Sequence, residues 1–525
     1  MVQSLTASSL TAGIIRQWVA LAAEVLSHNA EMLNGLNVFP VADSDTGSNL
    51  AASMRGAAVA IAEVPDGATA SQLLAVAAQG ALRAGRGNSG VILSEWLRGF
   101  AQSFQKSDSV AEALQQAASS AHDAVAKPAP GTILTAAQAA ADGTAADGAS
   151  DSAPNGEVSQ TVEAALVAAR AAAEKSSTIL AALARAGVDD AGACGLVLVL
   201  GALKEVLNGG NNIANIELGF DPFEADTGSD PGQLGATEDG GWQEGDDADE
   251  DGFEVMFTLR RPAGAKEFET GQVAAQLRRE LAEIGNSVVV VGGLAVGDAT
   301  KDSEWHSHVH VSDLSAALQL IDRWRQKGVV AAIQVRHLAV PAGDLNLWVT
   351  TNDPALIAEY ARGGAVVLVP SGGTPVSDDV ISAVKASPTT ANIVLAAPGD
   401  VAAVSAGLTY PTDLILGPDN AAAQALLLMV AGDQVSAGTE IDAVRECFAR
   451  LVCADTGLEP TGLPGVIAEA IGSGLVVAAV PVQEPPMALE AAREQCEAAG
   501  AELVVIERSD RDPVIHWATE RPDAN

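Results

Sequence analysis

The chain has 525 residues, a formal net charge of -38 at pH 7 and only 3% aromatic residues. This length exceeds what one hydrophobic core supports and indicates about three domains. The acidic excess argues against nucleic acid or an anionic membrane surface as a partner, because phosphate groups require a basic surface, but it permits a basic protein partner.

The cysteines and the first residues bear on the cellular compartment. The N-terminal sequence lacks the basic start and continuous apolar segment of a secretory signal, and no run of about 20 residues is apolar enough to span a bilayer. We therefore expect a cytoplasmic protein, and the sequence leaves open whether it forms a homodimer. Scattered cysteines without metal-ligand spacing are typical of reduced cytosolic thiols, and the chain has four: Cys194, Cys447, Cys453 and Cys496.

The N-terminal region is predicted to be helical. From residue 11 to residue 33 apolar residues recur at helical spacing, and almost nothing up to residue 207 alternates with period two. The polar run 142–159 is predicted to be a loop within this helical domain. Further helices are predicted over 50–62, 71–84, 91–105, 110–126, 133–141, 161–183 and 195–207.

An acidic turn precedes the second of these helices. Asp43 and Asp45 are two carboxylates one residue apart, and Mg²⁺ typically takes one or two carboxylates while phosphate oxygens and waters complete its shell. Residues 46–49 would present free backbone N–H groups at a helix N-terminus, where an anion is favoured. Taken alone, the segment is better explained as an ordinary capped turn, because Asp, Ser, Thr and Gly are the residues that turns and caps select.

Two glycine-rich segments strengthen the anion-binding interpretation. Gly85-Arg86-Gly87-Asn88-Ser89-Gly90 would let backbone amides approach a ligand closely, and its arginine could face an anion. A second segment, 188–195, contains Asp190 and Gly192 and again opens an apolar run. No segment matches the P-loop pattern G-x-x-x-x-G-K-[ST], so a nucleotide site in this chain requires another architecture.

The character of the chain changes after the helical domain, which is predicted to end near residue 218. The segment 219–251 is rich in glycine and acids and is predicted to be a disordered linker, because it has little to bury. A middle α+β module follows over 252–340. Its strands are predicted at 253–259, 287–291, 308–311 and 329–335, and its helices at 271–284 and 314–327.

The remaining residues, 341–525, are predicted to form an α/β domain. Short buried strands alternate with helices there, which indicates a largely parallel sheet with helices on both faces. A glycine-rich segment, 372–375, follows the strand predicted over 365–369. A tight turn explains it most simply, and a ligand-binding loop at the end of a parallel strand is the alternative.

The middle module carries the segment His306-Ser307-His308-Val309-His310, although the chain has only seven histidines. If this segment is a strand, His308 and His310 lie on one face, a geometry that suits two imidazole ligands on one metal ion. Two ordinary strand histidines are the simpler explanation.

Four segments, taken in order, resemble the N-terminal nucleotide-binding domain shared by the ATP-binding subunit of dihydroxyacetone kinase and bacterial fatty acid kinase. They are 34–49, 85–93, 131–135 and 190–196. The sequence Leu36-Asn37-Val38-Phe39-Pro40-Val41 is similar to that of the fatty acid kinase branch, and the resemblance continues over nearly the whole chain. It implies a DhaL-like helical barrel with the nucleotide at one mouth, and a C-terminal DegV-like domain used for partner docking.

The resemblance also implies an activity. A fatty acid kinase subunit uses ATP and Mg²⁺ to phosphorylate the carboxylate of a fatty acid, which a DegV-type fatty-acid-binding protein presents, and the acyl phosphate serves phospholipid metabolism. Carried over by motif, Asp43 and Asp45 would be the catalytic Mg²⁺ ligands, with Asn37 as a weaker candidate. The nucleotide and its phosphates would be held by Thr46, Gly47, Ser48, Asn49, Gly87, Asn88, Ser89, Asp190 and Gly192.

The chain also departs from the family pattern. Family members usually carry Pro-Asp-Gly-Asp-Thr-Gly-Thr-Asn, whereas Ala42, Ser44 and Ser48 replace three of these residues here. Some members bind zinc in the middle module through a cysteine and two histidines. Glu254 stands at the position of that cysteine, which makes zinc at Glu254, His308 and His310 a weaker expectation, although a carboxylate can ligate zinc.

Two other functions remain open from the sequence. The first is a kinase of a small polyol such as dihydroxyacetone, which the long C-terminal half and the segment 37–41 disfavour. The second is a regulatory or binding protein whose kinase domain responds to nucleotide but is inactive.

Overall fold

The computed structural model describes most of the chain, and it divides into two compact units. The first unit comprises Met1–Glu250 and Thr258–Val311, and the second comprises Asp251–Phe257 and Ser312–Asn525. The described residues are 9–40, 44–146, 157–223, 252–261, 270–293, 303–340, 345–370, 376–386, 391–396, 398–408, 413–418, 420–432, 437–457, 462–470, 474–481, 487–509 and 514–521.

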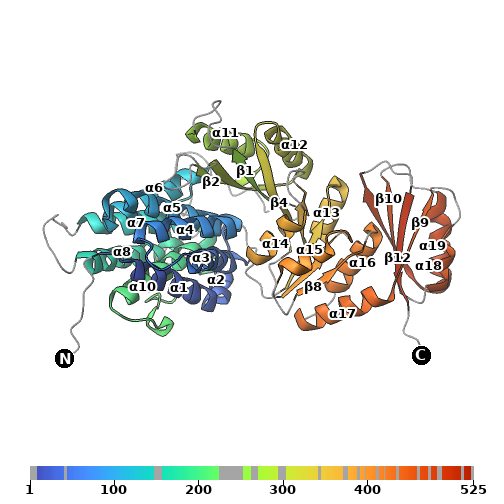
Figure 1. The fold of residues 1–525 in the computed structure, drawn as a ribbon, viewed down its shortest axis with the longest axis horizontal. Coiled ribbons are helices and arrows are strands. Elements are labelled where there is room, and N and C mark those ends of the chain that lie inside the picture. Colours follow the sequence, from blue (N-terminus) through green and yellow to red (C-terminus); the bar gives the residue numbers. More distant parts are fainter. Residues whose placement is uncertain are drawn as a thin grey trace. The chain divides into compact units, whose positions relative to one another are not determined.

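The helices of the first unit form a closed ring. Contacts run from α1 to α3, α4, α5, α6, α7, α8 and α10 in turn, and α10 returns to α1. This ring confirms the predicted helical N-terminal region, which is the blue to green part of the ribbon (Figure 1). The helices are α1 (Ala12–His28), α2 (Ala30–Gly35), α3 (Thr46–Ala62), α4 (Ala70–Ala84), α5 (Gly87–Ser107), α6 (Val110–Ala124), α7 (Ile133–Ala146), α8 (Glu157–Ala173), α9 (Ala181–Ala186) and α10 (Ala191–Leu207), with short 3-10 turns η1 (Ser176–Thr178) and η2 (Ile213–Asn215).

Aromatic side chains link helices of this ring. The Trp18 and Phe100 rings meet edge to face with centroids 5.7 Å apart, and Phe104 stacks on Phe100 at 6.1 Å. The indole Nε1 of Trp18 donates to the carbonyl oxygen of Val199 at 3.0 Å. Trp18 therefore joins α1 to both α5 and α10 and satisfies its own polar atom while buried.

We expect Trp18→Ala to lower the free energy of unfolding by about 3–5 kcal/mol, because it removes a fully buried ring and leaves a cavity. Chemical denaturation monitored by circular dichroism measures the change. Glu24→Ala, at an exposed position of the same helix, is the control and should change stability by less than about 0.5 kcal/mol. Equal losses in the two variants would contradict this role of Trp18.

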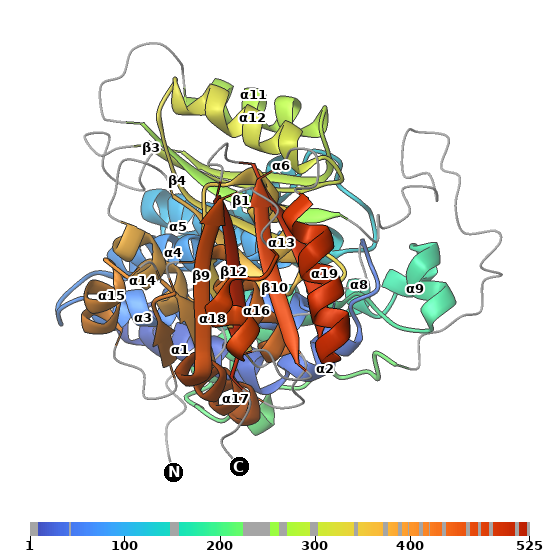
Figure 2. The same ribbon diagram turned by 90° about the vertical axis from the view of Figure 1, so that its right-hand side faces the viewer.

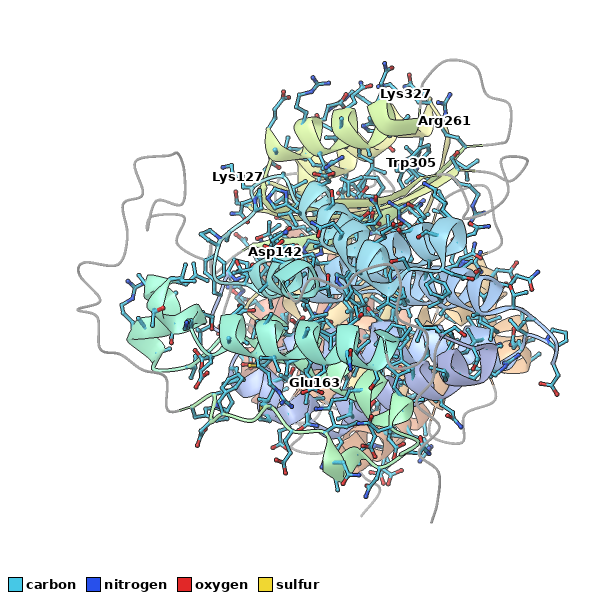
Figure 3. All side chains as sticks on the ribbon, turned by 90° about the vertical axis from the view of Figure 1, so that its left-hand side faces the viewer. Lys127, Asp142, Glu163, Arg261, Trp305 and Lys327 are labelled. Atoms are coloured by element: carbon cyan, nitrogen blue, oxygen red, sulfur yellow. The ribbon has the colours of Figure 1, made fainter. Side chains whose placement is uncertain are left out.

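The boundary of α7 corrects one sequence prediction. Of the loop predicted over 142–159, residues 142–146 and 157–159 are helical, because α7 continues to Ala146 and α8 begins at Glu157. Asp142 therefore lies on the helix α7 and not in a loop. Figure 3 labels it there, together with Glu163 on α8. Gln138 Nε2 donates to Asp142 Oδ1 at 2.8 Å, an i,i+4 pair that stabilises this last part of the helix. The predicted loop residues 147–156 lie outside the described residues.

The prediction of one continuous helix over 161–183 is also wrong, because the structure has three shorter helical elements there. The helix α8 ends at Ala173 and is followed by η1 and α9. The break is stabilised by tertiary hydrogen bonds: Ser176 Oγ lies 3.2 Å from Asp189 Oδ1, and the amide of Asp190 donates to Ser176 Oγ at 2.8 Å. Helical periodicity does not register such contacts with a distant segment.

A small α/β part completes the first unit. It contains α11 (Thr270–Ala282), the antiparallel pair β2 (Asn286–Gly293) and β3 (Ser303–Val311), and the end of β1 (Phe253–Arg261). The strand β2 is attached to the helical ring, since the amide of Ala126 donates to the carbonyl oxygen of Val288 at 3.0 Å. Glu95 of α5 also accepts the Gly292 N–H, and its Oε2 accepts from Arg98 Nε at 2.7 Å. Burial raises the pKa of Glu95, and the contacts with Arg98 and the Gly292 amide oppose the rise.

The second unit corrects the prediction of one largely parallel sheet over 341–525, because its strands belong to two separate sheets. In the first of these sheets, neighbouring strands lie in the order β4-β6-β5-β7-β8. The strands β6, β5, β7 and β8 are parallel, and β4 is antiparallel to β6. The predicted turn 372–375 lies outside the described residues. The elements are α12 (Leu314–Arg325), β4 (Val329–His337), β5 (Leu345–Thr350), α13 (Pro354–Arg362), β6 (Ala365–Val369), α14 (Val376–Ala386), β7 (Ala391–Leu395), α15 (Val401–Gly407) and β8 (Asp413–Leu416).

A second sheet follows in the same unit, with strand order β11-β10-β12-β9. The strands β10 and β11 are parallel, and β12 is antiparallel to β10 and β9. Figure 2 views this sheet with α18 and α19 on the near side. The elements are α16 (Ala421–Gly432), α17 (Ala437–Arg450), β9 (Leu451–Gly457), α18 (Gly465–Ala470), β10 (Leu475–Pro481), α19 (Met487–Ala499), β11 (Glu502–Arg508) and β12 (Val514–Glu520).

Two general expectations can be compared with the described residues. Within them, no helix combines the length and the apolarity that crossing a bilayer requires. The four cysteines are free thiols, as the sequence predicts. Three of them are buried, and Cys453 is exposed. Burial raises the pKa of the Cys194 thiol well above its usual range, and the nearby aspartates Asp190 and Asp189 add to the rise, so Cys194 is a packed and unreactive side chain.

Candidate functional site

The N-terminus of α3 carries the predicted acidic turn. Asp45 is the N-cap residue of α3 and is 8% exposed, yet its carboxylate does not make the side-chain hydrogen bond that usually caps a helix. Ser44 has φ 54°, the left-handed region that glycine adopts without cost. Gly47 lies against α2, where a Cβ would fall 2.2 Å from the carbonyl oxygen of Ala30. Asp43 lies outside the described residues.

Two side-chain contacts tie the first turn of α3 to the preceding segment. Thr46 Oγ1 donates to Asn37 Oδ1 at 2.5 Å. The amide of Ser48 donates to Asn34 Oδ1 at 3.1 Å, and Asn34 Nδ2 donates to Ser48 Oγ at 3.0 Å. Asn49 N–H donates to the N-cap carbonyl at 2.9 Å. The sequence predicts free backbone N–H groups at all four residues 46–49. This prediction is corrected for Ser48 and Asn49, whose N–H groups already have acceptors.

The first turn of α5 packs against the first turn of α3. Gly87 has φ +54°, and a Cβ there would lie 2.2 Å from Nδ2 of Asn49, so only glycine fits this contact. Gly87, Asn88 and Ser89 form the first helical turn and not the loop that the glycines suggested. Within the described part of the chain, Oδ1 of Asn88 is buried without a hydrogen-bond partner. Arg86, the N-cap residue of α5, is also buried.

Asp190 joins the N-termini of two further helices. It is the N-cap residue of α10, and its Oδ1 accepts the Ala193 N–H at 2.7 Å. The same carboxylate accepts backbone N–H groups of Ile133, the first residue of α7, and of Gly192. Burial raises its pKa to about 7, although these three hydrogen bonds oppose the rise. Gly192 allows this approach, since a Cβ there would lie 3.1 Å from the Ile133 Cβ.

These contacts bring the predicted segments together. The helix α10 also meets α3, because a Cβ on Gly195 would fall 2.3 Å from Cδ1 of Leu50. The N-terminal turns of α3 and α5 are therefore in contact, those of α7 and α10 share one carboxylate, and α3 links the two pairs. Helix N-termini carry partial positive charge and orphan N–H groups, which favour phosphate. Asp45 adds a hard oxygen ligand for a cation beside them.

Some residues of this arrangement were missed by sequence reasoning. Ser53 and Ser94 are buried serines whose hydroxyls both donate to the carbonyl oxygen of Gly90. Asn34, which orients Ser48, was included in the resembling segment but given no role. Single polar residues inside apolar helices carry no signal in the sequence that separates a local hydrogen bond from a contact with another helix.

The strand residues predicted as metal ligands are also brought together. Glu254, His308 and His310 are buried, and their potential ligand atoms lie within 4.8 Å of one another. Burial lowers the pKa of His308 to about 3, so its imidazole is neutral and suited to a metal ion. Arg336 Nη1 lies 3.8 Å from Glu254 Oε2. Two imidazoles and a carboxylate are a ligand set that fits zinc.

The third histidine of this strand has different neighbours. His306 Nδ1 lies 3.2 Å from Thr258 Oγ1, and its Nε2 lies 3.5 Å from Glu304 Oε1. Burial alone would raise the pKa of Glu304, but His306 and two arginines lower it to about 2. His306 therefore belongs to a separate ion-pair group.

Comparison with known proteins finds similarity in the helical region. Residues 40–205 match the family model of the DAK2 domain. An uncharacterized protein of Staphylococcus aureus (strain bovine RF122 / ET3-1) is 26% identical over 403 residues, which cover 74% of this chain and 70% of that protein. An uncharacterized protein of the USA300 strain is 33% identical over 208 residues, covering 38% of this chain and 37% of that protein.

Solved structures were compared as well. The dihydroxyacetone kinase from C. freundii in complex with AMP-PNP and Mg²⁺ is 25% identical with a TM-score of 0.31, covering 39% of this chain and 36% of that chain. The native form of that kinase gives a TM-score of 0.29 at 24% identity, covering 39% of this chain and 37% of that chain. The assignment therefore depends on the family model: the segment 40–205, which contains the four converging helix N-termini, is similar to the DAK2 domain, and this match supports a kinase-type phosphotransferase.

Proposed function

We propose that this chain is the ATP-dependent kinase subunit of a fatty acid kinase. In the proposed reaction, a carboxylate oxygen of a fatty acid attacks the γ-phosphorus of ATP, the bond from that phosphorus to the β-phosphate oxygen breaks, and acyl phosphate and ADP leave. A separate DegV-type fatty-acid-binding protein presents the fatty acid, and the C-terminal α/β region, proposed to be DegV-like, docks that partner.

The observation that carries the proposal is the convergence of the N-termini of α3, α5, α7 and α10 inside the segment that matches the DAK2 domain. Phosphoryl transfer requires positioning and charge neutralisation more than covalent chemistry from the protein. Helix N-termini supply the first partial positive charges for a phosphate chain, and a bound Mg²⁺ supplies the rest.

Specific roles follow for the residues of the site. Asp45, together with Asp43 from the sequence, would hold Mg²⁺, because Asp45 places a buried carboxylate at the N-terminus of α3, and carboxylates are ligands that Mg²⁺ prefers. Asn37 would orient Thr46 through the hydrogen bond between them. The backbone amides at the starts of α3 and α5, together with Nδ2 of Asn88, would donate to phosphate oxygens. When bound, Mg²⁺ neutralises charge on the transferred phosphoryl group.

A zinc ion at Glu254, His308 and His310 is a second part of the proposal. The support is their proximity and burial and the neutral form of His308. We expect about one equivalent of zinc in the purified chain by elemental analysis, and its loss in His308→Ala. Zinc retained in that variant, or absent from the parent chain after growth with zinc, would contradict this part without affecting the kinase assignment.

The activity is tested by incubating the purified chain with ATP, Mg²⁺ and a fatty-acid-loaded DegV-type protein from the native cell. Acyl phosphate is trapped with hydroxylamine, and ADP is measured in parallel. We expect both products only when nucleotide, metal and loaded partner are all present. Removal of the metal with EDTA should abolish turnover, and added Mg²⁺ should restore it, because the phosphate charge is then neutralised again.

The same assay separates the two rival functions. ADP formation with dihydroxyacetone, and none with the fatty acid, would replace the proposal by a polyol kinase. Tight binding of Mg²⁺-ATP without transfer to either acceptor, across several loaded partners, would identify a nucleotide-responsive regulatory protein. Each result contradicts the proposed fatty acid kinase activity.

A further inference from the structure

Two buried serines converge on one carbonyl oxygen in the first turn of α5. Ser53 Oγ of α3 lies 2.9 Å from the carbonyl oxygen of Gly90 and 3.2 Å from that of Asn49 in its own helix, and Ser94 Oγ lies 2.7 Å from the Gly90 oxygen. Both side chains are 0% exposed. Ser94 Oγ also lies 2.9 Å from the carbonyl oxygen of Ala81 near the end of α4. The first turn of α5 is thus held between α3 and α4.

The two contacts differ in kind. A hydroxyl close to the carbonyl four residues earlier in its own helix, as in Ser94 with Gly90 and Ser53 with Asn49, is common in helices. The contact from Ser53 comes from another helix and requires glycine at its partner, because a Cβ on Gly90 would lie 2.9 Å from Ser53 Oγ and 2.8 Å from the Asn49 carbonyl oxygen. Serine and glycine together therefore set the closest approach of α3 and α5.

This contact lies one turn behind the residues assigned to the phosphates. Gly87 to Ser89 begin α5, and Gly90 follows them directly. On α3, Ser53 lies one turn beyond Asn49, whose amide packs on Gly87, and two turns beyond Asp45. The contact of the Ser53 hydroxyl with Gly90 therefore lies between the helix that carries Asp45 and the first backbone amides of α5, whose relative positions it constrains.

We propose that Ser53 and Ser94 are positioning residues that hold the first turn of α5 in register with the metal-binding end of α3 during phosphoryl transfer. The inference rests on the proposed function. Neither serine touches the nucleotide in this scheme; each acts through the Gly90 carbonyl. Transfer depends steeply on alignment, and a misplacement of about 1 Å costs on the order of 100-fold in rate.

The chain offers a matched control on the same helix. Nine residues further along α5, Gly99 packs closely on Ser120 of α6, since a Cβ on Gly99 would lie 2.6 Å from Ser120 Oγ. Ser120 is also buried, and its hydroxyl accepts from Gln116 Nε2 at 3.1 Å. Ser120→Ala therefore removes a buried hydroxyl from another close glycine–serine contact of α5, two turns or more beyond the phosphate-binding turn.

The experiment compares Ser53→Ala, Ser94→Ala, their double variant and Ser120→Ala in the full-length chain, by urea unfolding and by steady-state kinetics with Mg²⁺-ATP and the loaded partner. We expect similar midpoints of unfolding for the three single variants. Only the first two should lower kcat, by about 10- to 100-fold, with a smaller rise of about threefold in the KM for ATP, because the displaced amides also hold the phosphates. Their losses should not add in the double variant, because both act on one carbonyl.

Equal kcat losses in Ser53→Ala and Ser120→Ala, or a loss in Ser53→Ala confined to the unfolding midpoint, would overturn the positioning role. If the parent chain transfers no phosphoryl group, the proposed function fails on its own, and the serines are judged by calorimetric affinity for Mg²⁺-ATP. A weaker affinity in Ser53→Ala but not in Ser120→Ala then supports positioning, and unchanged affinity, or no binding by the parent, overturns it.

Discussion

Asp45→Asn should abolish phosphoryl transfer and leave the chain folded. The substitution keeps the size of the side chain at the N-cap of α3 but removes the negative charge that would hold Mg²⁺ beside the helix N-termini. A metal ion contributes several kcal/mol to stabilising the transferred phosphoryl group, so we expect kcat to fall on the order of 1,000-fold. Initial rates of ADP release over a series of Mg²⁺ concentrations measure the loss.

The fold should tolerate this change because asparagine matches aspartate in size and is favoured equally at a helix N-cap. The free energy of unfolding should therefore change by less than about 1 kcal/mol. Asp142→Asn is the control, since Asp142 is exposed on α7, and it should retain parental turnover. Turnover of Asp45→Asn within threefold of the parent chain at saturating Mg²⁺ would remove the metal assignment.

The sequence predicted the parts of this site but not their assembly. Asp45, Gly87 and Asp190 were singled out because carboxylates and glycines stand where apolar helices begin. Their convergence depends on contacts between helices far apart in the chain, such as Gly87 with Asn49. Periodicity reports which face of a helix is buried and says nothing of which helix covers it.

The main errors have local physical causes. Glycine at 87 suggested a loop, yet its left-handed φ lets the first turn of α5 start against Asn49. Ser44 stands where the resembling family carries glycine, and its φ of 54° costs roughly 1 kcal/mol in backbone strain. We expect Ser44→Gly to be tolerated for this reason.

The strands β9 and β12 were not predicted at all. Their sequences mix apolar residues with Asp455 and His516, which weakens the alternation by which strands are detected. In the sheet the two residues are register partners, and His516 Nδ1 lies 3.1 Å from Asp455 Oδ1. A cross-strand pair of this kind stabilises the sheet through residues that look like loop residues in isolation. The same-face placement of His308 and His310 was correctly predicted, because it follows from the strand period alone.

Asp190 should make the stability of the chain depend on pH near neutrality. Its pKa is about 7 in the folded chain because of burial, against 3.8 for an ordinary aspartate. Between these values the folded state holds a proton that the unfolded state has lost, so stability falls as pH rises from about 4 to 7. The contribution of this group is about 1.4 kcal/mol per pH unit, and it levels off above pH 7.

Asp190→Asn should flatten this dependence, because the amide does not ionise while its oxygen still accepts the Ala193 N–H. Urea unfolding at pH 5, 6, 7 and 8 measures the slopes. We expect the variant to be less stable than the parent at pH 5, since an amide cannot accept all three N–H groups as the carboxyl group does, and the difference to shrink toward pH 8. Asp142→Asn should leave the parental slope unchanged. Parallel pH profiles of the parent and Asp190→Asn would show that this carboxyl group does not titrate in the window, and that the starts of α7 and α10 hold it ionised throughout.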